Sequence, residues 1–154
     1  MVVISCQTGA IVEVDAQTLR GAKFSGLNLH RAVFEGKDLT DAIFVGADLR
    51  GSLFTGAIVK HAKFERAKMM NAACDIADLE GANLVDTKLV GADFSGANLR
   101  DANLGGADVG FASFKGADLR GANMVCTRIE DADFEGALFD DRTVFPDGFT
   151  PPDC

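Results

Sequence analysis

The residues that could carry chemistry in this sequence are few and far apart. Two histidines and four cysteines are spread over 154 residues with no CxxC pair, namely His30, His61, Cys6, Cys74, Cys126 and Cys154. A catalytic triad needs a nucleophile, a base and an orienting group that converge on one point, and this spacing gives no reason for convergence. Wide cysteine spacing also disfavours a zinc site. We therefore expect that the protein is not an enzyme, with no catalytic residue, no metal and no cofactor.

Carboxylates are the most numerous ionisable groups, and most of them lie in the C-terminal half. The formal net charge is −8, from 23 acidic and 15 basic residues. Residues 75–154 carry 16 acids and six bases, whereas residues 57–74 carry one acid and four bases. An acidic chain repels DNA and anionic lipid surfaces. We therefore expect no direct contact with nucleic acid and no membrane association.

The N-terminal segment gives an expectation for localisation. It lacks the basic region that opens a signal peptide, and no run of 18 apolar residues is long enough to span a bilayer. We expect a cytoplasmic protein with reduced cysteines. A removed signal or transit peptide remains an alternative.

A period of five residues must position all of these groups. Stepping by five from Leu19 to Phe139 gives 25 positions, here called centres, and all of them are apolar. Two residues before the centre, 19 of the 25 positions are Ala. A period of five fits neither a helix face nor a flat strand. Each unit is therefore a short extended piece followed by a turn, with one large and one tiny residue facing into a narrow tube.

This motif resembles the A(D/N)LXX pattern of the pentapeptide repeat family, over residues 17–141. The resemblance implies an all-β fold, a right-handed quadrilateral β-helix with four pentapeptides per coil and about six coils. We then expect residues 1–16 to form an N-terminal cap strand or partial coil, and residues 142–154 a C-terminal cap and tail. Some family members that bind topoisomerase dimerise through a C-terminal helix. No such helix is evident here, so we expect a monomer or a weak homodimer.

With four faces, every fourth pentapeptide stacks on the same face. One resulting ladder contains Phe34, Phe54, Cys74, Phe94, Phe114 and Phe134. Cys74 is either a reactive thiol or a buried small hydrophobe, and free cysteines are commonly buried. A disulfide between Cys126 and Cys154 requires the tail to fold back, because the Cα atoms must lie within about 7 Å.

The function that we expect is a non-enzymatic protein–protein interaction scaffold, an acidic rod with an unidentified protein partner. A first alternative, which the resemblance implies, is a DNA-mimicking modulator or inhibitor of DNA gyrase of the quinolone-resistance type. A rod with regularly spaced carboxylates can occupy a cleft that binds DNA. A second alternative is a structural or regulatory repeat module. The candidate acidic surface comprises Asp78, Glu80, Asp86, Asp93, Asp101, Asp108, Asp118, Asp131, Asp133 and Glu135.

The acidic pattern also has a plainer interpretation, in which Asp and Asn serve the backbone of the motif and keep the rod soluble. Two further features are candidates for partner contact. One is a basic belt formed by Lys60, His61, Lys63, Arg66 and Lys68. The other is Phe111, an aromatic residue at a predicted corner.

Overall fold

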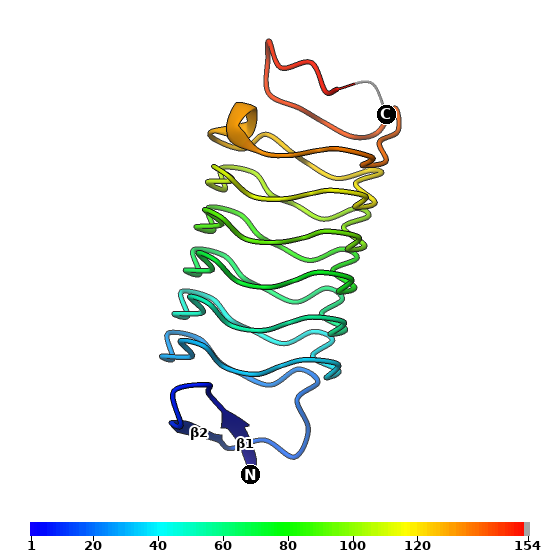
Figure 1. Cartoon of the computed structure of the whole chain (residues 1–154). Coiled ribbons are helices and arrows are strands. Elements are labelled where there is room, and N and C mark those ends of the chain that lie inside the picture. Colours follow the sequence, from blue (N-terminus) through cyan, green and yellow to red (C-terminus); the bar gives the residue numbers. More distant parts are fainter. Residues whose placement is uncertain (153–154) are drawn as a thin grey trace.

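The chain forms a rod of stacked coils in a computed structural model that describes residues 1–152 (Figure 1). Two strands, β1 (Val2–Ser5) and β2 (Ile11–Val14), form an antiparallel hairpin at the N-terminal end. A 3-10 helix, η1 (Ile129–Asp131), lies near the C-terminal end. Between them the chain is held by single β-bridges. Within the described part of the chain, no helix is long and apolar enough to cross a bilayer.

The coils pair in parallel with a constant step along the sequence. Bridges join Lys23 to Ile43, Ile43 to Lys63 and Lys63 to Asn83, and the same step recurs on the other sides. Each step spans four of the five-residue motifs, so each coil consists of four pentapeptides. The predicted fold, a right-handed quadrilateral β-helix, is confirmed.

One pentapeptide, residues 43–47, shows how the backbone of a coil is satisfied. The Ile43 N–H donates to the Ala22 carbonyl in the coil below, at 2.9 Å. The Phe44 and Gly46 N–H groups donate to carbonyls of the coil above, at 2.7 and 2.9 Å. The Ala47 N–H closes a turn onto the Phe44 carbonyl, at 2.9 Å. Four of the five amides in this unit thus have backbone partners, which fixes the spacing between coils.

Inward side chains fill the tube as the motif predicts. The centres from Phe24 to Phe134 are buried, and Leu19 and Phe139 at the two ends are partly buried. Phenylalanines of successive coils stack, with ring centroids 4.8 Å apart for Phe34 and Phe54 and 4.7 Å apart for Phe24 and Phe44. Rings on adjacent sides meet edge to face. The inward Ala positions leave the room that this stacking needs.

Two inward positions that carry a hydroxyl residue in place of Ala satisfy it internally. The Ser52 hydroxyl donates to the Leu49 carbonyl at 2.7 Å, and the Thr87 hydroxyl donates to the Phe64 carbonyl at 3.0 Å. Both side chains are fully buried, where an unpaired hydroxyl would be costly. These exceptions to the Ala rule therefore leave the core intact.

The corners require left-handed backbone. Every fifth residue from Gly21 to Gly121 has a positive φ, between 51° and 72°. Glycine adopts this conformation without steric cost, and Asp and Asn tolerate it. Three basic residues also occupy such corners, Arg31, His61 and Arg66, as do two large hydrophobic residues, Ile76 with φ 51° and Phe111 with φ 59°. A β-branched or aromatic residue in this region is an outlier.

The regular period breaks in the last coil, where the sequence repeat continues without interruption. Cys126 is buried instead of forming a corner, and the next positive φ falls at Arg128. Thr127 pairs with Asp108, which is one position short of the regular step. The chain then forms η1 before Val144 pairs with Asn123, one position beyond that step. Within residues 1–152 no further coil stacks on this segment, so no ladder above it enforces the regular step.

Both ends of the core are covered. In the hairpin, Ile4 and Val14 are buried against the first coil. At the other end the Phe145 ring packs on Phe139 at 5.2 Å between centroids, and the Phe149 ring lies 5.9 Å from Phe134. Aromatic residues of the tail thus close the last hydrophobic layer, in place of a terminal helix.

We predict that Ala97→Leu destabilises the protein by about 1–3 kcal/mol, because Ala97 is 1% exposed and the added atoms overpack one coil. Ala73→Leu is the matched control. Ala73 is half-buried at an outward position, paired with Leu53 one coil below. Urea unfolding of both variants checks the assignment. An Ala97→Leu variant as stable as the control would contradict it.

Candidate interaction surface

The four sides of the rod are named here by the centres that they carry. Side A carries the centres in register with Leu39, side B those with Phe44, side C those with Leu49 and side D those with Phe54. The residues directly before and after each centre face outward, and the corner follows two residues after the centre.

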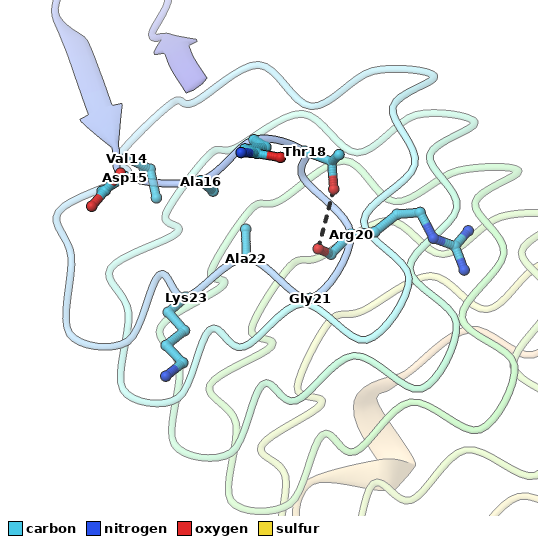
Figure 2. A pocket seen from close by; sticks show the side chains of 9 residues that line it. Val14, Asp15, Ala16, Thr18, Arg20, Gly21, Ala22 and Lys23 are labelled. Atoms are coloured by element: carbon cyan, nitrogen blue, oxygen red, sulfur yellow. Dashed lines mark hydrogen bonds between the residues drawn. The ribbon is translucent and has the colours of Figure 1, made fainter. Parts of the chain in front are cut away.

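Apolar side chains fill the core of the rod formed by residues 1–152. Hollows open at its ends instead. One lies at the N-terminal end, lined by residues 14–18 and 20–23, where the Thr18 hydroxyl hydrogen-bonds the Arg20 carbonyl (Figure 2). Another lies between η1 and the tail at Phe149. Among residues 1–152, no cluster of three or more His, Cys, Asp and Glu side chains could hold a metal ion.

Asp and Asn before the centre bind the one amide that the coils leave unpaired. The Asp118 carboxylate accepts from the Arg120 N–H at 3.2 Å, and the Asn83 amide oxygen accepts from the Val85 N–H at 3.2 Å. This contact spans two residues and is an Asx turn. Every Asp or Asn at this position makes it: Asn28, Asp38, Asp48, Asp78, Asn83, Asp93, Asn98, Asn103, Asp108, Asp118, Asn123 and Asp133.

The ten candidate acidic residues therefore occupy three kinds of place. Five are Asx caps, namely Asp78, Asp93, Asp108, Asp118 and Asp133. Two, Asp86 and Asp101, are corners with positive φ. Glu80, Asp131 and Glu135 serve neither purpose. Seven of the ten candidate acids thus lie at positions where the backbone itself favours Asp or Asn.

Most of these carboxylates also face a base from their own chain. Lys60 binds Asp78 and Glu80 of the next coil, with Nζ–O distances of 3.2 and 3.0 Å. Lys115 bridges Asp133 and Glu135 in the same way. The remaining pairs are Arg120 with Asp118, Arg142 with Asp101, and Arg128 with Asp108 and Asp131. Asp86 and Asp93 form no ion pair among the residues described.

Hydrogen bonds to these carboxylates favour their ionised form. Side-chain hydrogen bonds from Arg120 lower the pKa of Asp118, although partial burial opposes the change. The Glu135 backbone N–H lowers the pKa of Asp133. The hydrogen bond from Lys60 lowers the pKa of Glu80. Asp118, Asp133 and Glu80 thus keep their charge to a lower pH than an unperturbed carboxyl group would.

Acid is unevenly distributed around the rod. On side D and its following corner, the acids are Glu35, Asp75, Asp93, Asp133 and Glu135, and Lys115 is the one base. Side C below η1 differs, because Arg31, Arg50, Lys68 and Lys88 outnumber Asp48 and Asp108 there. The ten candidate acids therefore do not share one face, and side D is the side with the fewest bases for its acids.

The basic belt is likewise divided by the fold. Lys60 lies on side A and is paired, Lys63 lies on side B, and Lys68 lies on side C. His61 and Arg66 form the corners between these sides. The five residues thus spread over three of the four sides of one coil and do not form a single patch.

Two strained corners carry exposed hydrophobic side chains. Phe111 is 68% exposed, and the Arg128 guanidinium lies 5.1 Å from its ring centroid. Ile76 is 67% exposed. It forms the corner one coil below Gly96, and a side chain at position 96 would bring its Cβ to 3.3 Å from the Ile76 Cγ2 atom. The two corners flank side D. Phe111 was predicted as a contact residue from its corner position, whereas Ile76 was not, although an apolar residue at a corner is the same signal.

In the described part of the chain, the cysteines and histidines are not brought together. Cys6, Cys74 and Cys126 are buried thiols, and burial raises the pKa of each, to about 12 for Cys126. Such thiols are poor nucleophiles. Cys154, the other half of the disulfide considered above, lies outside the described residues. The two histidines, His30 and His61, are exposed on different coils.

Family models of pentapeptide repeats match residues 19–63, 77–110 and 102–141. Among solved structures, the chain is similar to the pentapeptide repeat protein Rfr23 from the cyanobacterium Cyanothece 51142. The two are 26% identical over 75% of this chain and 65% of that chain, with a TM-score of 0.52. This chain therefore spans just under two thirds of the length of Rfr23.

Two other solved structures are more distant. HetL, a pentapeptide repeat protein involved in heterocyst differentiation regulation from the cyanobacterium Nostoc sp. strain PCC 7120, is 26% identical over 82% of this chain and 78% of its own, with a TM-score of 0.38. QnrB1, a plasmid-mediated fluoroquinolone resistance protein, is 17% identical over 81% and 87%, with a TM-score of 0.29. Comparison with proteins of curated function gave no match. The five-residue motif, the coil of four pentapeptides and the family matches show that this chain belongs to the pentapeptide repeat family.

Proposed function

We propose that the protein is a non-enzymatic scaffold that binds another protein through its outer surface. The observation that carries this proposal is the pair of strained, exposed hydrophobic corners, Ile76 and Phe111. A non-glycine residue with left-handed backbone costs about 1–2 kcal/mol. Glycine would serve these corners without that cost, so the bulky side chains are best explained by a contact that they make.

The placement of the two corners supports one partner surface. They border the same side, side D, and they lie seven pentapeptides apart in a rod with four pentapeptides per coil. Their separation along the rod is therefore about 8 Å, at ~4.8 Å per coil. Aromatic and large aliphatic side chains are frequent anchors of protein interfaces. Both corners can thus contact one partner across side D.

We expect Phe111→Gly to lower partner binding at least ten-fold without lowering the melting temperature. The variant loses the contact with Arg128, which contributes about 0.5–1 kcal/mol. It also relieves the left-handed strain, about 1–2 kcal/mol. Thermal unfolding and quantitative pull-down of the wild type, Phe111→Gly and Ile76→Gly measure both effects. Equal capture by all three proteins would contradict the proposed contact.

A second candidate is a DNA-mimicking modulator of DNA gyrase. The observation that favours it is the acid excess on side D, five carboxylates with one base. Electrostatic complementarity to a DNA-binding cleft would use the carboxylates that have no internal base, and Asp93 is one of them. This candidate places the contact on the same side as the two hydrophobic corners.

For gyrase, the expectation is inhibition of supercoiling at low salt that fades as salt rises, because charge contacts are screened. Asp93→Asn removes an unpaired charge and keeps an Asx acceptor, so inhibition should weaken. Asp118→Asn is the control, since Arg120 already neutralises that carboxylate, and its effect should be smaller. Absence of inhibition at tens of micromolar protein would eliminate this candidate and leave the scaffold.

A further inference from the structure

The first coil has an open hydrogen-bonding edge. In the second coil, the carbonyls of Ile43, Val45 and Asp48 accept from amides of the coil below. The equivalent groups of the first coil have no such partner. Within residues 1–152, the N–H groups of Lys23 and Asn28 and the carbonyls of Lys23, Ser25, Asn28 and His30 form no hydrogen bond. The edge therefore runs along sides B and C with the hydrogen-bonding pattern of a strand that lacks its neighbour.

The N-terminal hairpin covers a different part of this coil. Cys6 forms an antiparallel β-bridge with Ala32, and the Val33 N–H donates to the Ser5 carbonyl at 2.8 Å. The hairpin thus replaces the missing coil at side D, at the N-terminal end of the rod (Figure 1). Ser25 and Asn28 are exposed, whereas the equivalent Val45 and Asp48 are half-buried. Sides B and C of the first coil are accordingly left accessible.

The chain segment that forms this edge is basic, whereas the whole chain is acidic. Residues 16–34 contain Arg20, Lys23 and Arg31 and no acid, although the net charge of the protein is −8. Arg20 is partly neutralised by Asp38, at 2.6 Å. Lys23 and Arg31 form no ion pair within residues 1–152, and His30 is the last residue of the edge, directly before Arg31. An acidic segment is therefore attracted here and repelled by most of the rod.

We infer that this edge, residues 22–30, binds an extended acidic peptide of a partner protein as an added β-strand. The inference rests on the proposed scaffold function and names one of its binding sites. Main-chain hydrogen bonds to Lys23 and Ser25 on side B and to Asn28 on side C provide the affinity, and the bases select acidic side chains. The hollow lined by residues 14–18 and 20–23 adjoins Lys23 and gives access to the start of the edge (Figure 2).

Two competing arrangements are disfavoured by charge. Pairing of this edge with the same edge of a second copy would bring two sets of Arg20, Lys23 and Arg31 together. Addition to the outer edge of β2 would place an acidic peptide beside Glu13 and Asp15. Residues 16–34, which include the first-coil edge, contain no acid to repel an acidic strand, and the hollow beside the edge is lined by one acid, Asp15, and two bases, Arg20 and Lys23.

The test uses random peptides of about nine residues displayed on phage, a length that spans roughly 30 Å when extended. Selected peptides are synthesised and titrated into the full chain, and amide hydrogen exchange is followed by NMR. The expected result is enrichment of Asp and Glu, together with at least ten-fold slower exchange at Lys23 and Asn28. Failure to enrich any sequence would overturn the inference, as would enriched peptides that leave these two amides unprotected.

Two variants separate the strand edge from a merely basic surface. Lys23→Pro removes an N–H that the fold does not use, and Lys23→Ala is the control that keeps it. Binding at least ten-fold weaker for Lys23→Pro than for Lys23→Ala supports strand addition, and equal affinity contradicts it. If the proline variant does not fold, the double variant Lys23→Glu and Arg31→Glu keeps the backbone and should weaken binding at least ten-fold. Unchanged binding by that variant would contradict the selection of acidic peptides.

These outcomes are independent of the corners on side D. Capture of a partner that depends on Phe111, without peptide binding at the first coil, would reject the edge and retain the scaffold. Peptide binding together with a corner variant that captures its partner normally would reject the corners and retain the edge.

Discussion

The structure depends on backbone hydrogen bonds between coils that lie four pentapeptides apart in the sequence. In a regular unit such as residues 43–47, four of five amides bond to backbone carbonyls, and the corner must adopt a positive φ to bring them into register. The fifth amide faces outward without a backbone partner. These requirements place one small and one large residue inward, favour Gly, Asn or Asp at corners, and favour Asp or Asn just before the centre.

Part of the acidic character of the rod follows from this constraint, which favours Asp or Asn at the cap positions. The carboxylates of Asp118 and Asp133 accept hydrogen bonds from the amide that has no backbone partner. Bases of the same chain, Arg120 and Lys115, also bind these two carboxylates. A surface built in this way is acidic without having evolved to contact a basic partner. Residues that the backbone does not require are therefore more informative about function. Ile76 and Phe111 are such residues, because glycine would serve the same corners.

Much of the fold could be predicted from the sequence, because each motif encodes its own conformation. The inward positions and the stacked phenylalanines such as Phe34 and Phe54 follow from the period. The irregular turn at Cys126 could not be predicted, because the sequence motif continues there. The backbone leaves the regular four-pentapeptide step at a place where no coil above holds it. The pairing of Lys60 with Glu80 and the open edge at Lys23 were likewise hidden, because they depend on which coils are neighbours.

The most direct test of this account compares two valines on side B by native-state hydrogen exchange. The Val85 N–H donates to the side-chain oxygen of Asn83. The Val45 N–H has no partner within residues 1–152, because the position equivalent to Asn83 is occupied by Ile43, whose side chain cannot accept a hydrogen bond. If Asx caps complete the hydrogen bonding of the coil, the Val85 amide should exchange at least ten-fold more slowly than that of Val45. In Asn83→Ala the two rates should converge. Equal protection of both amides in the wild type would contradict the claim that Asp and Asn are present for the backbone.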